Sequence, residues 1–143
     1  MKGIPIELSA ALVALICAIV VPLAVGQTKI RGKQGGYVRL ISQLRAKGAT
    51  VKPSSERVSQ PFFSVKGRIL MVNGQAVQVF EFPNAARAAA EAKRVGPTAT
   101  TSVAWIAPPH FFHSGRLIVL YVGDNESILK QLTTVLGPQF AGQ

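Results

Sequence analysis

The longest apolar stretch of the chain lies close to its first residue. Leu8 to Val25 form a run of eighteen residues without a charge. An α-helix rises about 1.5 Å per residue, so this run extends roughly 27 Å, and residues 4–6 bring it near the ~30 Å thickness of a bilayer core. The pattern predicts a single transmembrane anchor within residues 1–26. Its main apolar side chains are Leu8, Leu12, Leu15, Ile19 and Leu23.

A cleavable signal peptide is the main alternative for this segment. Such peptides have an apolar core of about 7–15 residues and a cleavage site with small residues. Ala24-Val25-Gly26 is a passable cleavage site, but the apolar run is longer than usual, which favours a retained anchor. Cys17, the one cysteine, follows bulky Ile16 where a lipoprotein signal requires a small residue, so we expect an ordinary buried cysteine.

A polar, basic connector follows, which we assign to residues 27–60. Its first part, Gln27 to Gly36, contains glycines and cations and is typical of a linker. Lys29, Arg31 and Lys33 would lie at the membrane surface, where each cation contributes about 1 kcal/mol against an anionic leaflet. The sequence therefore predicts a folded domain held close to lipid headgroups.

Residues 37–47 of this connector have the spacing of an amphipathic helix. Apolar side chains recur at i, i+3, i+4 and i+7, and Gly48 provides an end to the helix. We expect this stripe to pack against the folded domain, and contact with the membrane or with a partner is the alternative. The stripe consists of Tyr37, Leu40, Ile41 and Leu44.

Residues 61–143 contain an internal repeat with an offset of 41 positions, the separation of Asn84 and Asn125. The same overlay places Gly96-Pro97 on Gly137-Pro138. Each copy then consists of a hairpin, a strand, an asparagine helix cap, a helix and a Gly-Pro stop. The sequence predicts two ββα units.

The hairpin turns are marked by short polar pairs. Asn73-Gly74 stands between two strand-like runs, and a type I′ turn requires positive φ at both central positions, which asparagine and glycine tolerate. The second turn lies around Ser114-Gly115. The run from Leu117 to Val122 is apolar on both faces, so we expect it to be a central strand.

Two hairpins and two helices predict an α+β domain. We expect one antiparallel sheet of four or five strands with both helices on one face. The fifth strand would come from Thr50-Val51 or Phe62-Phe63. In the first helix, Arg87 and Glu91 form an i, i+4 pair that we place on the exposed side. The other sheet face would be covered by residues 37–47 or would be a docking surface.

Charge narrows the range of partners. Sixteen lysine and arginine residues stand against six aspartate and glutamate residues, which gives a net charge of +10 at pH 7 over 143 residues. Lipid headgroups and acidic proteins suit such a surface, and a solvated basic surface without a ligand is equally open. No nucleic-acid partner is expected, because the cations are scattered and no nucleic-acid motif is present.

Candidate chemistry is limited to two histidines. His110 and His113 could approach one metal ion, but no third ligand is evident nearby apart from Asp124, so we expect a loop or strand-edge pair and no metal. No serine has the setting of a G-x-S-x-G nucleophile, and no glycine-rich phosphate loop follows a strand. We therefore predict a non-enzymatic chain without a cofactor.

Aromatic residues cluster beside these histidines and Pro108-Pro109. Such a cluster can be a rigid contact patch, because tryptophan and phenylalanine contribute strongly to interface energetics. It can equally be a local core that closes the end of the sheet. The candidate interface residues are Trp105, His110, Phe111, Phe112 and His113.

Six segments of the chain resemble a family of small uncharacterised bacterial proteins. They are residues 58–63 (VSQPFF), 72–74 (VNG), 79–82 (VFEF), 105–111 (WIAPPHF), 115–124 (GRLIVLYVGD) and 136–142 (LGPQFAG). The resemblance covers residues 44–143 and implies no activity. It implies a lipoprotein-like protein displayed outside the cytoplasmic membrane, with some members in photosynthetic bacteria. The chain departs from that pattern in its full-length apolar helix and its lack of a good lipobox.

Two arguments oppose each other on the side of the membrane. The cations that follow the apolar helix, Lys29, Arg31, Lys33 and Arg39, place the domain in the cytoplasm by the positive-inside rule. The resemblance implies an extracytoplasmic domain, in the periplasm or a lumen. We favour the extracytoplasmic side, because the resemblance extends over the whole domain and should still indicate its location even though the anchor differs.

These expectations lead to a functional hypothesis. The chain is expected to be a non-enzymatic single-pass accessory subunit, whose folded domain caps or stabilises the subunits of a larger membrane protein complex. A respiratory or photosynthetic host complex is suggested by association only. The alternative is a membrane-tethered extracytoplasmic binding module for a lipid or small ligand. A third hypothesis, an enzyme, rests on His110 and His113 alone.

Overall fold

The computed structural model describes residues 34–101 and 103–142. The helices of this part are α1 (Gly36–Ala46), α2 (Ala85–Thr101) and α3 (Glu126–Leu136), and its strands are β1 (Val51–Val58), β2 (Gly67–Val72), β3 (Gln75–Glu81), β4 (Pro109–Ser114), β5 (Leu117–Val122) and β6 (Ala141–Gly142). The predicted anchor, residues 1–26, and the predicted membrane-surface residues Lys29, Arg31 and Lys33 lie outside the described residues. Within the described ranges, no helix has both the length and the apolar composition of a bilayer-spanning segment.

The six strands form one antiparallel sheet in the order β1-β2-β3-β5-β4-β6. The predicted α+β class is confirmed, and β5 occupies the central position expected for its apolar sequence. The sheet has more strands than the four or five expected. Both additional strands are edges, and β6 has only two residues, Ala141 and Gly142, which is too short for a recognisable pattern.

The apolar stripe of α1 packs on the sheet, as predicted. Its four members, Tyr37, Leu40, Ile41 and Leu44, are all buried in one core with residues of the strands. The helix ends at Ala46, and Gly48, the predicted stop, follows with a φ of 85°. The amide of Ala49 donates to the carbonyl of Leu44 at 3.0 Å and closes the last turn. The stripe thus faces the core of the domain and not a lipid surface.

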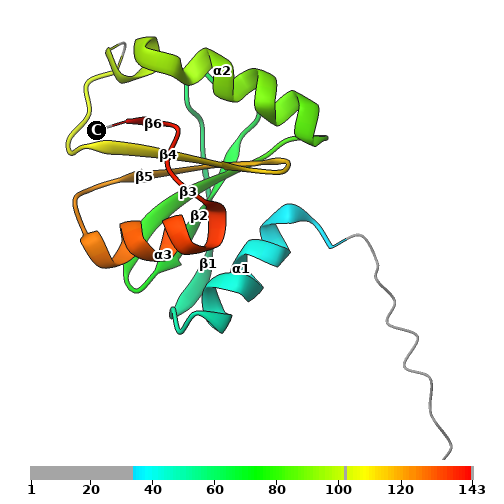
Figure 1. The fold of residues 1–143 in the computed structure, drawn as a ribbon, viewed down its shortest axis with the longest axis vertical. Helices are drawn as coiled ribbons and strands as arrows, with labels where there is room; N and C mark the ends of the chain where they lie inside the picture. Colours follow the sequence, from blue (N-terminus) through cyan, green and yellow to red (C-terminus); the bar gives the residue numbers. More distant parts are fainter. Residues whose placement is uncertain (1–33, 102, 143) are drawn as a thin grey trace, which may run out of the picture. The chain divides into compact units, whose positions relative to one another are not determined.

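The helices cover both faces of the sheet. Figure 1 shows α2 on one side of the sheet and α1 and α3 on the other. The expectation that the two helices of the repeat share one face was therefore wrong. Alternate residues of β5 serve the two sides, since Val119 packs in the core with α1 and α3, whereas Ile118 and Leu120 pack in the core with α2.

The connections that follow β3 and β5 account for this difference. In the sequence overlay, Gly123 takes the place of Phe82, which is buried in the core beneath α2. Gly123 instead has a φ of 155°, and a Cβ atom there would lie 2.5 Å from the hydroxyl oxygen of Tyr121. Only glycine permits this path, which takes the chain toward the α3 side.

Strand β1 lies within the segment that the sequence assigned to a connector. Of its eight residues only Val51 is buried, and Pro53 stands beside a break in the register with β2. A polar strand with a proline is tolerated at a sheet edge, where one side forms no ladder hydrogen bonds. Residues 36–58 therefore belong to the folded domain, and the predicted boundary at residue 61 is too late.

The predicted turns and helix caps agree with the structure. Asn73 and Gly74 have φ values of 48° and 80°, as a type I′ turn requires. The Asn84 side chain accepts a hydrogen bond from the amide of Arg87 at 2.8 Å, and Asn125 accepts from the first turn of α3. The predicted stop at Gly96 is a kink, because the helical segment continues to Thr101.

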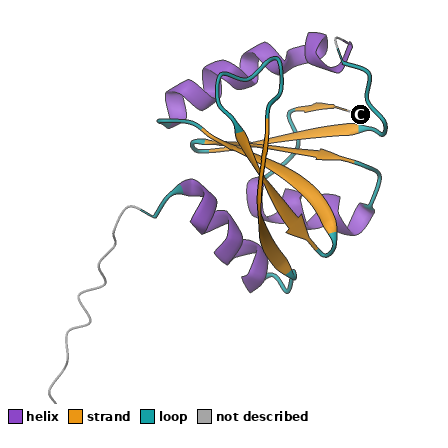
Figure 2. Cartoon of the chain, turned by 180° about the vertical axis from the view of Figure 1, so that it is seen from behind, coloured by secondary structure: helices purple, strands orange, loops and turns teal. Residues whose placement is uncertain are grey.

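The loop between β1 and β2 closes the α2 side of the domain. Figure 2 shows this loop rising beside α2. Phe63 from the loop is buried against Phe80 and Phe82, with ring centroids 4.6 and 6.0 Å apart. The Phe62-Phe63 segment is therefore a core-filling loop and not the additional strand considered from the sequence.

Candidate functional site

A partly exposed aromatic patch surrounds the buried ring of Phe111 on β4. The centroid of that ring lies 5.9 Å from Phe62, 6.1 Å from Trp105 and 6.2 Å from Phe140. Phe140 is 39% exposed, and Ile106, next to Trp105, is 100% exposed. We call Phe62, Trp105, Ile106 and Phe140 the aromatic patch. Three loops that are far apart in the sequence thus meet on the side chain of Phe111.

The structure separates the predicted interface residues. Phe111 is fully buried beneath the aromatic patch, whereas Phe112 is buried on the opposite face of the sheet with α1 and α3. Neither phenylalanine is available to a partner, because successive side chains of a strand point to opposite faces and both faces are covered. The prediction that Phe111 and Phe112 belong to an interface was therefore wrong. Both belong to the core, which was the alternative considered from the sequence. Trp105 keeps a partly exposed side chain.

The two histidines also lie on opposite faces. His110 pairs with Tyr121 across the strands and stacks on its ring at 6.2 Å, whereas His113 contacts Phe140. His110 Nδ1 is 2.7 Å from the Gln139 side-chain oxygen, and its Nε2 has no partner among the described residues. An i, i+3 pair on one strand cannot converge on a metal ion. No cluster of three metal-ligating residues occurs in residues 34–101 and 103–142.

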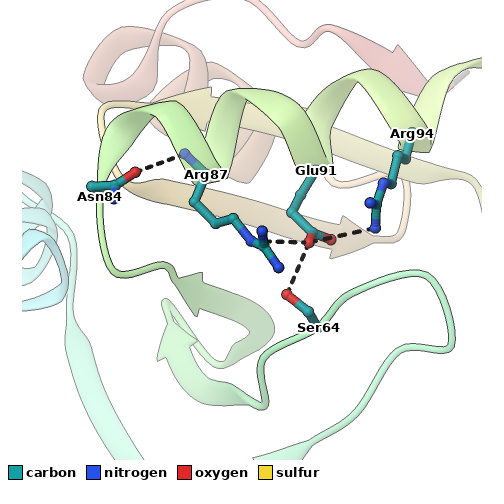
Figure 3. Close-up of polar contacts among 5 residues, drawn as sticks. All are labelled: Ser64, Asn84, Arg87, Glu91 and Arg94. Carbon is teal, nitrogen blue, oxygen red and sulfur yellow. Dashed lines mark hydrogen bonds and ion pairs between the residues drawn. The ribbon is translucent and has the colours of Figure 1, made fainter.

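A buried carboxylate on α2 was not predicted. Glu91 is 1% exposed, and its Oε1 accepts a hydrogen bond from the hydroxyl of Ser64 at 2.9 Å (Figure 3). Arg87 and Arg94 approach the same oxygen at 3.8 and 3.7 Å from largely exposed positions. The carboxylate therefore links the β1–β2 loop to α2. The prediction that Glu91 lies on the exposed side of the helix was wrong.

A second region is a basic cleft beside the start of α1. It encloses about 310 Å³. Four cationic side chains from three segments line it, together with Tyr37 and a single carboxylate, Glu81. The four cations are Arg57, Lys66, Arg68 and Arg116. We call this region the basic cleft.

Glu81 connects one of these cations to the helix. Its Oε1 lies 3.3 Å from Nε of Arg116, and the same oxygen accepts a hydrogen bond from the amide of Tyr37 at 3.4 Å. The carboxylate thus caps α1, whose Gly35 cap has no side chain, and it interacts favourably with the positive end of the helix dipole. Arg116 also donates to the carbonyl oxygen of Phe82 at 3.0 Å.

Tyr37 forms the wall of the basic cleft. The guanidinium carbon of Arg68 lies 4.7 Å from the centre of its ring, a distance suited to a cation–π contact. Burial raises the pKa of the Tyr37 phenol above 10.0, and the positive charges of Arg68 and Arg57 partly oppose that rise. The phenol is therefore protonated at neutral pH, and Tyr37 adds no negative charge to the lining of the cleft.

Comparison of the chain with protein-family models, with curated proteins and with solved structures gave no match.

Both unpredicted regions had only weak signals in the sequence. Glu91 occupies the inner stripe of α2, at i+3 from Ala88 and i−4 from Val95, and this spacing could have placed it toward the core. The four cations of the basic cleft come from three places in the sequence, since only Lys66 and Arg68 are near neighbours, so no local motif joins them all. Their meeting depends on the pairing of β1 with β2, which the sequence did not predict.

Proposed function

We propose that the chain is a non-enzymatic single-pass accessory subunit of a larger membrane protein complex. In this proposal residues 1–26 anchor it in the bilayer, and the folded domain lies on the extracytoplasmic side and contacts integral membrane subunits. The observation that supports a docking role best is the aromatic patch, where a fully exposed Ile106 follows the partly exposed Trp105 in the sequence. A respiratory or photosynthetic host remains part of the proposal by association only.

The aromatic patch has the composition expected of an interface anchor. Large aromatic side chains provide much contact area, and those near the centre of an interface contribute most of its binding energy. Here the rings of Phe62, Trp105 and Phe140 rest on Phe111, which is fixed between two paired strands. A partner would therefore meet side chains that are already ordered, which lowers the entropic cost of association.

Co-purification of variants from membranes tests this function. The full chain with a C-terminal tag is solubilised in mild detergent, and the chains recovered with it are identified by mass spectrometry. Ile106→Asp places a charge in the aromatic patch, and we expect it to reduce recovery of the partner subunits about tenfold or more, as for an interface anchor. The folded domain should remain intact, because Ile106 is 100% exposed.

A matched control uses Val38, which is 48% exposed on α1 and lies outside the aromatic patch. Val38→Asp makes the same kind of change, and we expect normal recovery of partners. Equal recovery with the wild-type chain and with Ile106→Asp would remove the patch from the proposal. Recovery of the wild-type chain alone or as a homodimer would contradict the accessory role itself.

The alternative function, a tethered binding module for a lipid or small ligand, is favoured by a different observation. The basic cleft has a volume at the lower end of the range of roughly 300–1,000 Å³ that is usual for ligand pockets. Its lining carries four cations and one carboxylate. The ligand suited to such a lining is small and anionic.

A further inference from the structure

Three of the four cations in the basic cleft lack a carboxylate partner within the described part of the chain. The ion pair formed in the cleft joins Arg116 to Glu81 at 3.3 Å. Arg57, Lys66 and Arg68 make no ion pair with the described carboxylates. Because these three cations line one hollow, the local positive charge is concentrated and not spread over the surface.

The pairing of β1 with β2 places two of these cations directly opposite each other. Arg57 is the register partner of Arg68. Like charges at facing positions of an antiparallel pair destabilise the sheet, because their Cβ atoms are only about 4.5–5.5 Å apart. An anion between the two guanidinium groups converts this repulsion into attraction. The arrangement therefore favours occupation of the basic cleft by a negative group.

Two of the guanidinium groups are already oriented. Arg68 stacks on the ring of Tyr37, and Arg116 is held by the Phe82 carbonyl oxygen and by Glu81. Guanidinium groups form paired hydrogen bonds with the oxygens of a phosphate, and orientation before binding reduces the entropy lost on binding. Arginines on neighbouring strands and on the β4–β5 turn can thus reach one ligand from different sides.

We propose that the basic cleft binds a phosphate group between Arg57, Arg68 and Arg116, with Lys66 as an additional cation. The phosphate belongs either to a lipid headgroup or to a free phosphate compound, since the recognition chemistry is shared. This inference specifies the ligand of the binding-module alternative. It does not depend on the accessory role, because the basic cleft and the aromatic patch share no residue.

Calorimetric titration of the full chain in non-ionic detergent at low ionic strength tests this site. Three probes are used: inorganic phosphate, glycerophosphoglycerol and glycerophosphocholine. Glycerophosphoglycerol carries the phosphodiester of an anionic lipid headgroup. Glycerophosphocholine carries a fixed positive charge that cancels the negative charge of its phosphate. We expect saturable binding of at least one of the first two probes and much weaker binding of glycerophosphocholine. Tighter binding of glycerophosphoglycerol indicates a lipid headgroup, and tighter binding of inorganic phosphate indicates a free phosphate compound.

The Arg57→Gln/Arg68→Gln variant removes the facing pair. We expect it to bind the preferred probe about tenfold more weakly or worse, because charge-assisted hydrogen bonds are lost. Without any probe, Arg57→Gln alone should melt at a higher temperature than the wild-type chain, since the repulsion is relieved and the contact of Arg68 with the Tyr37 ring is kept. Arg57→Gln alone, at an exposed position of β1, provides a milder version of the same test.

Lys93→Gln/Lys130→Gln is the matched control, because it removes two exposed cations from α2 and α3, outside the basic cleft. We expect its binding to change less than twofold. The proposal is overturned by the absence of saturable binding of both anionic probes, by wild-type binding in the facing-pair variant, or by an equal loss in the control. None of these results bears on recovery of partner subunits, so the failures of the two proposals are distinguishable.

Discussion

At the scale of single residues, Glu91 is the least expected feature of the domain. Its carboxylate is buried, yet both arginines near it are mostly exposed and lie at 3.7 and 3.8 Å. Its Oε2 has no hydrogen-bond partner among the described residues. Burial of a charge is costly, and long contacts with solvated cations offset only part of that cost. The carboxylate positions the β1–β2 loop through Ser64 at the expense of stability.

Replacement of Glu91 by an apolar residue of similar length should therefore stabilise the domain. We expect Glu91→Met to raise the free energy of unfolding by about 1 kcal/mol, because no charge is then buried and the cavity stays filled. Glu91→Ala should lower it by about 1–3 kcal/mol, since a cavity is left behind. Thermal unfolding in detergent, followed by circular dichroism, provides both values. A large loss of stability in Glu91→Met would show that the contacts outweigh the cost of burial.

Tyr37 leads to a prediction on pH. Burial raises the pKa of its phenol from 10.0, against the smaller opposing effects of Arg68 and Arg57. Because the folded state then holds this proton more tightly than the unfolded state, the stabilising contribution is complete below about pH 10 and decreases as the pH rises above it. Melting temperatures of the wild-type chain should fall between pH 9 and pH 11, and more steeply than those of Tyr37→Phe. Parallel curves for the two proteins would contradict this assignment.

At the scale of elements, β2 and β3 meet in a crowded contact at Gly67. A Cβ atom at Gly67 would lie 2.7 Å from the buried ring of Phe80. Since the ring is fully buried and has no room to move, Gly67→Ala should lower the free energy of unfolding by about 1–3 kcal/mol. In a Phe80→Leu background the same substitution should cost clearly less, because the ring is gone. Equal costs in both backgrounds would indicate a backbone effect of glycine and not a clash.

Elements with a local signal were predictable from the sequence. The stripe of α1 has its own period, Asn84 and Asn125 stand before helices, and Asn73-Gly74 fits one turn type, so each follows from a few neighbouring residues. The sides taken by α2 and α3 were not predictable in this way. They depend on the path through Gly123, and the repeat in the sequence suggested equivalence where the backbone differs.

Among the candidate site residues too, those with a local signal could be predicted and those that depend on the fold could not. Trp105 stays a predicted interface residue, chosen because aromatic residues are conspicuous in any sequence, whereas the burial of Phe111 and Phe112 required knowledge that both sheet faces are covered. The basic cleft depends on the facing positions of Arg57 and Arg68. The sequence suggested an additional strand at Thr50-Val51, where β1 begins, but the polar residues that follow gave neither its length nor its pairing with β2, so that register could not be derived.

At the scale of the whole molecule, net charge and domain size have different consequences for the side of the membrane on which the domain is proposed to lie. The net charge of +10 favours the cytoplasmic side only where cations lie close to the anchor or in short loops. The described residues from 36 to 101 and from 103 to 142 fold into one domain with a single sheet, and domains longer than about 60 residues are translocated largely regardless of their charge. The cations that bear on orientation are therefore those close to the predicted anchor, Lys29, Arg31, Lys33 and Arg39, and not the whole net charge.

Labelling of a single introduced thiol decides the side. Ser114 is exposed next to the β4–β5 turn, and the one native cysteine, Cys17, lies in the predicted anchor. We expect Ser114→Cys to react with a membrane-impermeant maleimide on intact bacterial spheroplasts, while the wild-type chain stays unlabelled because a thiol in the bilayer is shielded from the reagent. Reaction of Ser114→Cys only after permeabilisation would place the domain in the cytoplasm. It would then show that cations such as Lys29 and Arg31 determine the orientation, and that the docking partner must be sought on that side.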